Sequence, residues 1–364
     1  MIQEFLNGPF RCLRTHHLRM AYSDDMTQVG RFNLRKVTHL FKLIYLTAMR
    51  RLRMGPCYLF YPPAGPNLFP ILRDVVYLLC TRWMFLGTIF DFQAAGVSER
   101  VAALPAPLRL LAHLAYGKVM CAVKLSKFNP DDPAAFRARN SFEIPNASAD
   151  VALKTWGPTF GRQTFGSQGK AEGEPVRLLF VGVLNESKGT LIFLDAVQSL
   201  LNQGFAVRAD MVGEIENSTV RAEIERRIAD PRLKQAVTFH GRLIGDAKWG
   251  RFQAADIFVF PTYFESESFG LVLTEAMQFG LPIVSTKWRG VQSVVVEGET
   301  GFLVPIKNSE AVAEKIRLLV EDPELAARMG AAGRQRYEEH YTLERFWERK
   351  EDAILKSIAN QSIA

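Results

Sequence analysis

The sequence is poor in the residues that mark several large classes of protein. It has four cysteines in 364 residues, and none of them lies in a C-x-x-C spacing. This excludes a disulfide framework, a zinc ribbon and a thioredoxin-like pair, and favours reduced thiols. No Asp-x-Asp pair occurs, and His16, His17 and His240 have no metal-ligand spacing with acidic residues. We therefore expect no metal site and no cofactor.

Long apolar runs are also missing. The most apolar stretch, residues 75–90, is interrupted by Arg82 and is too short to span a bilayer. No charged segment followed by an apolar one opens the chain. The sequence therefore predicts a cytoplasmic protein, either free or peripheral on the inner face of the cytoplasmic membrane.

What remains is an ordinary globular composition with unevenly distributed charge. The chain is 48% apolar and 23% charged, and its length predicts two domains. Residues 1–150 carry 19 basic and 10 acidic residues, whereas the rest carries 26 and 28. The basic first half favours an anionic partner: nucleic acid, lipid head groups or a phosphorylated substrate. Because the basic residues lack aromatic interleaving, nucleic acid is not expected.

The hydrophobic periodicity predicts an α/β protein. From residue 176 onward apolar strands alternate with amphipathic helices, which indicates a parallel, doubly wound sheet with its ligand outside the carboxyl ends of the strands. In the first half we expect strands at residues 10–20, 57–63, 83–92 and 119–126. The Gly/Ser/Thr-rich segment 146–175 reads as a linker. We place an N-terminal acceptor-binding domain at 1–150, the linker at 151–175, a donor-binding domain at 176–340 and a closing helix at 341–364.

The first residues are unusual for such a domain. Residues 1–8 look like the end of a helix closed by Asn7 and Gly8, and the next strand is expected only near Phe10. A doubly wound domain normally opens with a strand and a glycine-rich turn. Two explanations stay open: a wrongly assigned start, or a shorter variant that lacks the first strand.

The most informative segment is residues 261–286, PTYFESESFGLVLTEAMQFGLPIVST. A helix is expected to begin over Phe269, Gly270, Leu271 and Val272. Glu267 precedes this helix, and Glu275 lies within it. The spacing of two glutamates alone would arise by chance in a chain this long. The unpaired amides of the first helical turn, however, favour a bound diphosphate. We expect Glu275 about two turns into this helix.

This segment resembles the donor-binding signature of glycosyltransferase family 4, the group 1 glycosyltransferases. The resemblance implies GT-B architecture: two Rossmann-like domains facing across a cleft. It also implies a retaining, metal-independent transfer from a nucleotide-diphosphate sugar. By the same resemblance, Glu267 holds the hydroxyls of the donor sugar, Glu275 accepts from the ribose, and the amides from Phe269 to Val272 meet the diphosphate. An alternative stays open, in which Glu267 and Glu275 bind no ligand and only complement the dipole of the helix.

A second segment, FVGVLNESKGT at residues 180–190, is similar to the family's phosphate loop. Gly182 permits a tight turn after the strand, and the resemblance assigns Lys188 to the leaving diphosphate. Glu267 and Lys188 are thus the expected catalytic residues. Where the family usually carries an arginine, this chain has Val183. In the family, the loop that corresponds to the one around Arg242 and Leu243 lies near the base of the donor nucleotide, so these two residues are expected to contact the base.

In the first half the similarity is thinner. Gln93 occupies the position of a family histidine that faces the donor–acceptor cleft, so an acceptor contact is assigned to it. The segment 144–150 is similar to the family's linker entry, with Ala147 in place of a glycine. In the family, the closing helix crosses back to the N-terminal domain.

The basic segment 31–54 predicts an amphipathic helix. Leu34, Val37, Phe41, Ile44 and Ala48 form one stripe, with basic residues mostly opposite. One interpretation is a helix that lies on anionic lipid near a lipid-linked acceptor. The other is a packed Rossmann helix with a solvated face.

Together these observations predict a retaining glycosyltransferase that moves a sugar to a glycan or polyprenyl-linked acceptor in polysaccharide or cell-envelope glycan synthesis. An anionic membrane surface is a further candidate partner. The alternative is a catalytically impaired relative that binds nucleotide sugars or a partner without transfer. A sugar-nucleotide epimerase would need acid and base groups for which the sequence offers no set.

Overall fold

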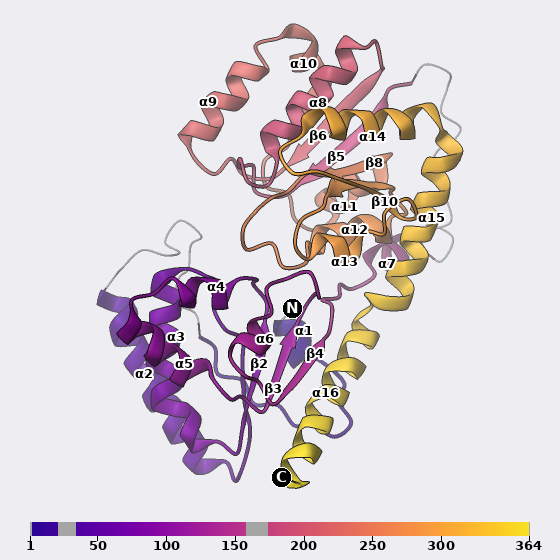
Figure 1. Ribbon diagram of the computed structural model, residues 1–364. Helices are drawn as coiled ribbons and strands as arrows, with labels where there is room; N and C mark the ends of the chain where they lie inside the picture. The colour runs from indigo at the N-terminus through magenta and orange to yellow at the C-terminus, as the bar shows by residue number, and fades with distance from the viewer. Residues whose placement is uncertain (1, 21–33, 158–173, 364) are drawn as a thin grey trace. The chain divides into compact units, whose positions relative to one another are not determined.

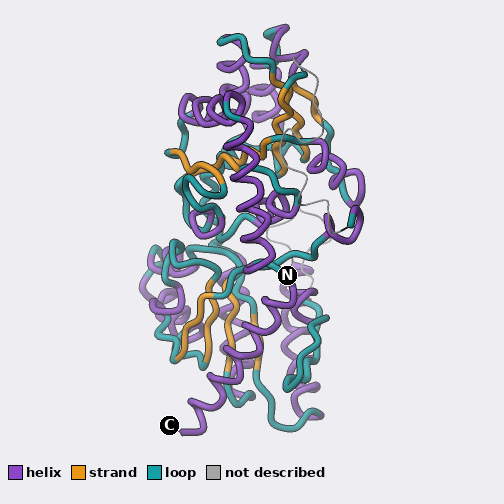
Figure 2. The backbone as a smooth tube through the Cα atoms, turned by 90° about the vertical axis from the view of Figure 1, so that its right-hand side faces the viewer, coloured by secondary structure: helices purple, strands orange, loops and turns teal. Residues whose placement is uncertain are grey.

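The computed structural model describes residues 2–20, 34–157 and 174–363 (Figure 1). They form two compact units: Met1–Pro145 together with Phe346–Ala364, and Asn146–Arg345. The expected division at residue 150 lies five residues from this boundary. Each unit holds a parallel sheet with helices packed around it, as Figure 2 shows. The predicted fold of two Rossmann-like α/β units is confirmed.

The sheet of the first unit has the strand order β1-β2-β3-β4, with all neighbours parallel. Its strands are β1 (Leu59–Tyr61), β2 (Thr88–Phe92), β3 (Cys121–Lys124) and β4 (Asn140–Glu143). The helices are α1 (Ile2–Leu6), α2 (Leu34–Arg53), α3 (Leu68–Thr81), the 3₁₀ turn η2 (Arg82–Met84), α4 (Val97–Ala102), α5 (Ala106–Tyr116), α6 (Asp132–Ala135) and, from the end of the chain, α16 (Leu343–Ile363).

The beginning of the chain departs from the expectation. The short helix α1 ends near Asn7 and Gly8 as predicted, but residues 10–20 form no strand. Instead, the amides of Arg11 and Cys12 donate to the carboxylate of Glu351 on α16, at 3.3 and 2.7 Å. The predicted strand at 10–20 is therefore wrong, and two of its backbone donors bond to a side chain from the far end of the chain.

Helix α2 forms as predicted, but its buried face differs in part from the predicted apolar stripe. Leu40, Leu43 and Thr47 are buried. Of the predicted stripe, Ile44 packs against the core, and the side chain of Leu34 lies outside the described part of the chain. Phe41, which belongs to the expected stripe, is 60% exposed. The periodicity in this segment therefore located a helix but misassigned part of its buried face.

The sheet of the second unit has the order β10-β9-β8-β5-β6-β7, again all parallel. The strands are β5 (Val176–Val181), β6 (Val207–Val212), β7 (Val237–Phe239), β8 (Ile257–Phe260), β9 (Ile283–Thr286) and β10 (Gly301–Val304). The helices are α7 (Val151–Trp156), α8 (Thr190–Asn202), α9 (Ser218–Arg227), α10 (Pro231–Ala236), α11 (Gly245–Ala254), α12 (Leu271–Gln278), α13 (Val291–Val294), α14 (Ser309–Glu321) and α15 (Pro323–His340). The strand–helix alternation predicted from residue 176 is confirmed.

The expected linker is only partly visible. Its first residues form α7, whose N-terminal Asp150 pairs with Arg334 on α15 at 2.5 Å. Residues 158–173 lie outside the described part of the chain. All four cysteines are free, as expected from their spacing. Within the described ranges, no helix is both long and apolar enough to cross a bilayer.

Candidate functional site

The topology of the second sheet fixes where a ligand belongs. From β5 the chain runs outward to β6 and β7, and then returns to place β8 on the other side of β5. From β5 the chain continues to β6 in one direction along the sheet, and from β8 it continues to β9 in the other. The carboxyl ends of β5 and β8 therefore mark the switch point of the sheet. The two segments singled out in the sequence, 180–190 and 261–286, contain the loops that follow these two strands.

The loop after β5 is held by short-range hydrogen bonds and close backbone contacts. The amide of Gly182 donates to Val212 at 2.9 Å. Asn185 accepts from the amide of Lys188 at 2.8 Å and donates to Glu216 at 3.1 Å. Gly189 has φ +84°, and a Cβ there would lie 2.2 Å from the carbonyl oxygen of Pro261. Only glycine therefore allows this loop to pack against the loop after β8.

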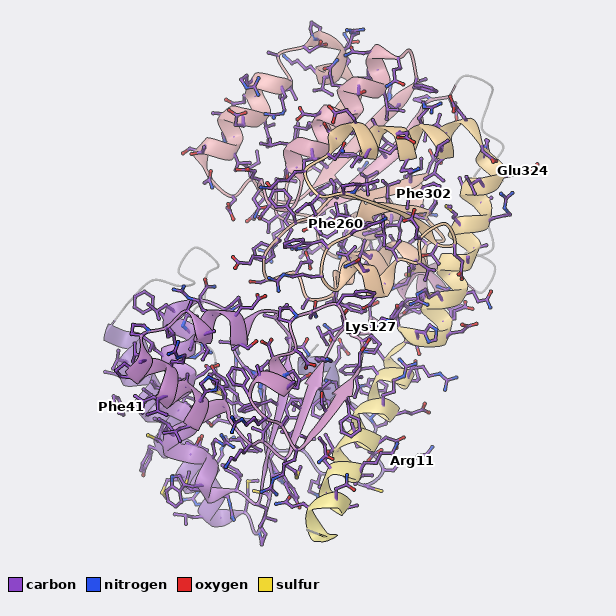
Figure 3. The ribbon with its side chains drawn as sticks, in the orientation of Figure 1. Arg11, Phe41, Lys127, Phe260, Phe302 and Glu324 are labelled. Carbon is purple, nitrogen blue, oxygen red and sulfur yellow. The ribbon has the colours of Figure 1, made fainter. Side chains whose placement is uncertain are left out.

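Lys188 and Glu267 meet across the switch point. The ammonium of Lys188 donates to Glu267 at 2.5 Å, and both side chains are largely buried. Thr262 lies 3.4 Å from the same carboxylate oxygen. The ammonium also lies over the rings of Phe264, at 4.5 Å, and Phe260, which is labelled in Figure 3. The structure thus brings the two expected catalytic residues into direct contact.

Helix α12 begins slightly later than expected. Gly270, at φ +79°, precedes α12, whose first residue is Leu271. Glu275 consequently lies little more than one turn into the helix, and the expectation of two turns is wrong. Phe269 is buried against the ring of Tyr341. The first-turn amides of α12 lack intrahelical acceptors by geometry, as any helix N-terminus does.

Glu275 has a partner that the sequence did not indicate. Lys248 on α11 donates to both carboxylate oxygens of Glu275 at 2.7 Å. Its ammonium also lies 4.5 Å from the ring of Trp249, which stacks on Phe279. Burial raises the pKa of Glu275, and the neighbouring Lys248 acts in the opposite direction. The site therefore contains two Lys–Glu pairs, one on each side of the start of α12.

The remaining expected contacts are placed as follows. Arg242 and Leu243 lie in the loop between β7 and α11, where Arg242 is exposed. Val183, which replaces the family's arginine, is 36% exposed. Gln93 follows β2 in the first unit, and its amide nitrogen donates to Asp91 at 2.9 Å. Across the described ranges, no cluster of three or more His, Cys, Asp or Glu residues is arranged to hold a metal ion.

Sequence reasoning missed Asn185, Thr262 and Lys248. The first two lie inside the segments already singled out, and their polar side chains near Lys188 and Glu267 were a usable signal. The sequence carries no such signal for Lys248. This residue precedes Glu275 by 27 positions, and the two come into contact only because α11 packs against the sheet.

The chain is similar to known glycosyltransferases in sequence and in fold. Residues 162–336 match the model of the family described as glycosyl transferases group 1. This part of the chain is a group 1 glycosyltransferase domain. The group 1 domain includes both Lys–Glu pairs and the switch point between them.

Two relatives illustrate the range of the match. The capsular polysaccharide biosynthesis glycosyltransferase CapM of Staphylococcus aureus is 28% identical over 180 residues, which is 47% of this chain and 44% of CapM. The D-rhamnosyltransferase WbpZ of Pseudomonas aeruginosa is 33% identical over 169 residues, 46% of this chain and 42% of WbpZ. The matched region thus spans less than half the length of either relative.

Solved structures show the same fold over most of the chain. Sucrose-phosphate synthase from Thermosynechococcus elongatus superposes with a TM-score of 0.68 at 21% identity, covering 89% of this chain and 79% of the synthase. Anabaena HepE in complex with UDP superposes with a TM-score of 0.66 at 18% identity, covering 88% and 82%. The GT-B fold therefore extends beyond the group 1 domain.

Proposed function

We propose that this chain is a retaining, metal-independent glycosyltransferase that moves a sugar from a nucleotide-diphosphate donor to a glycan or polyprenyl-linked acceptor. The observation that carries the proposal is the Lys188–Glu267 pair at the switch point, beside the start of α12. HepE was solved with UDP, which supports the donor class, and the name of CapM supports a role in polysaccharide synthesis. A lipid-linked acceptor would place the protein at the inner face of the cytoplasmic membrane.

The proposed chemistry uses charges that already face one another. Lys188 meets the departing diphosphate, together with the first-turn amides of α12. Glu267 accepts from the hydroxyls of the donor sugar, and Glu275 accepts from the ribose. The acceptor hydroxyl attacks the anomeric carbon on the face from which the diphosphate leaves. As the new C–O bond forms and the bond to the diphosphate breaks, a diphosphate oxygen takes the acceptor's proton.

Transfer of isotope-labelled sugar, with NMR assignment of the anomeric configuration in donor and product, tests this proposal. We expect Glu267→Gln to lower kcat about 100-fold, since the sugar loses its alignment. Glu275→Gln should mainly raise KM, by about 10- to 100-fold, through a lost charge-assisted hydrogen bond. Glu310→Gln, at an exposed position on α14, is the matched control. Inverted product or full activity in both site variants would contradict the assignment.

A second candidate function is nucleotide-sugar binding without transfer. It is favoured by Val183, which leaves Lys188 as the only cation expected in the loop after β5. Calorimetric titration with UDP and GDP, run beside the transfer assay, separates the two. Binding without labelled product over a panel of acceptors supports this candidate, and labelled product excludes it.

A further inference from the structure

The first unit displays large apolar side chains to solvent at helical spacing. On α2, Phe41, Tyr45 and Leu52 are 60%, 63% and 81% exposed. Steps of four and seven residues place them on one stripe, on the side opposite to the buried Leu40 and Leu43. Figure 3 shows Phe41 on the outer side of this helix. Single exposed apolar residues are ordinary, but a stripe of them is not.

The neighbouring helices continue this pattern. Leu79 on α3 and Trp83 on η2 are 39% and 77% exposed, and Leu110 and Leu114 on α5 are 63% and 59% exposed. The indole nitrogen of Trp83 already donates to Cys80 at 2.9 Å. Helices α2, α3 and α5 pack side by side (Figure 1). Their outer faces, together with η2, therefore form one surface, which we call the helix-layer surface.

The charge of this surface has one sign. Helices α2, α3 and α5 with η2 contain nine basic residues and one acidic residue, Asp74, whose side chain is buried. Arg50, Arg51 and Arg82 donate to backbone carbonyl oxygens. Among the described residues these three guanidinium groups bond to carbonyl oxygens, whereas Arg73 pairs with the buried Asp74 at 2.7 Å. Exposed apolar stripes flanked by an excess of cations are typical of proteins that lie on anionic membranes.

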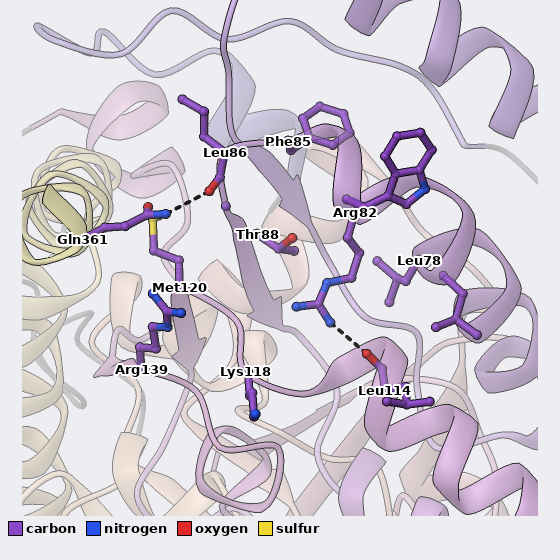
Figure 4. Close-up of a pocket in the computed structure, with 13 residues that line it drawn as sticks. Leu78, Arg82, Phe85, Leu86, Thr88, Leu114, Lys118, Met120, Arg139 and Gln361 are labelled. Carbon is purple, nitrogen blue, oxygen red and sulfur yellow. Dashed lines mark hydrogen bonds between the residues drawn. The ribbon is translucent and has the colours of Figure 1, made fainter. Parts of the chain in front are cut away.

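A pocket opens at the edge of the helix-layer surface. It has a volume of about 360 Å³ and lies between η2 and the end of α5, at the amino ends of β2 and β3. Leu79, Trp83 and Leu114 line one part, and Arg82, Lys118 and Arg139 supply three cations (Figure 4). Among the described residues that line it, none is acidic. Such a pocket suits a lipid phosphate next to buried acyl carbons.

We propose that the helix-layer surface is the site at which this protein binds an anionic phospholipid bilayer. The proposal deepens the membrane placement given under the proposed function and rests on it. The apolar stripes enter the boundary between head groups and acyl chains, while the surrounding cations meet lipid phosphates. A second copy of the chain would bring two positive surfaces together, and a nucleic acid would leave Leu52 and Leu114 without an apolar environment.

Co-sedimentation of the full chain with vesicles tests this surface. The vesicles consist of phosphatidylcholine alone or of its mixture with phosphatidylglycerol. We expect binding to the mixed vesicles that weakens as salt is raised. The triple variant Leu52→Gln, Trp83→Gln, Leu114→Gln should lose at least 10-fold of the partitioning. Leu153→Gln, at an exposed leucine in the second unit, should bind as the unaltered chain does.

Variants that remove single positive charges test the contribution of the cations to vesicle binding. Lys42→Gln and Arg53→Gln should each lower binding to mixed vesicles by up to about fivefold. Absence of binding to mixed vesicles, or full binding by the triple variant, overturns the proposal. So does a dimer in light scattering that the triple variant abolishes while no vesicle binding is seen. UDP titration of the same preparations measures binding at the proposed donor site independently of the vesicles. Loss of vesicle binding with UDP binding retained would count against the surface alone, and absence of UDP binding would count against the proposed function.

Discussion

Replacing Lys350 by methionine should destabilise the first unit more than any exposed substitution on the same helix. The ammonium of Lys350 on α16 is fully buried and pairs with Asp91 on β2, which is 3% exposed. Asp91 also accepts from Gln93 at 2.9 Å. In Lys350→Met the carboxylate stays buried with no countercharge. Removal of one partner from a buried ion pair costs about 3–5 kcal/mol.

This loss of stability should appear as a measurable fall in the melting temperature of the first unit. For a unit of this length, each kcal/mol lowers the melting temperature by about 2–4 °C, so a loss of roughly 6–20 °C is expected. Differential scanning calorimetry measures the shift, and hydrogen exchange in β2 and α16 assigns it to the first unit. Lys356→Met, at an exposed position of the same helix, is the control and should change the melting temperature little.

The double variant Asp91→Asn, Lys350→Met decides whether charge is the cause. Asparagine keeps an acceptor for Gln93 but carries no charge, so we expect the double variant to recover about 2–3 kcal/mol relative to Lys350→Met. If Lys350→Met costs no more than Lys356→Met, or if the double variant is as unstable as the single one, the reasoning is refuted.

The remaining predictions concern Glu275 of the proposed donor site and two glycines with positive φ. Because burial raises the pKa of Glu275, its ionised form is lost as pH falls through that raised pKa, and UDP affinity should fall with it. Lys248→Met removes the opposing charge, so titration should show the loss at a higher pH, whereas identical pH profiles would contradict the pairing. Gly189→Ala should cost more than 3 kcal/mol because its Cβ meets a backbone oxygen at 2.2 Å. Gly204→Ala, at φ +87° with open space around its Cβ, should cost about 1–2 kcal/mol. Equal thermal shifts would show that the contact at Gly189 is not rigid.

The second unit could be predicted well from the sequence for a physical reason. Its strands are buried runs such as β5 and β8, and its helices alternate with them at short intervals, so local pattern and final fold agree. The loops after these strands carry Lys188 and Glu267. Because parallel strands bring their carboxyl ends to one edge, the meeting of these two residues follows from topology.

The failures share a different cause. In the segment 10–20, where no strand forms, the amides of Arg11 and Cys12 donate to Glu351. Helix α2 turns Phe41 outward because Leu40 and Leu43 pack inward. Lys248 reaches Glu275 only through the packing of α11. Each depends on contacts between distant parts of the chain, which no local periodicity encodes.

The return of α16 to the first unit also bears on how the protein is made. The second unit is one continuous segment, Asn146–Arg345, whereas the first is completed only by Phe346–Ala364. Asp91 precedes Lys350 by 259 residues. At about 5–20 residues per second on the ribosome, this carboxylate waits roughly 13–50 s for its cation. The first unit can therefore be completed only after the whole segment of the second unit has been synthesised.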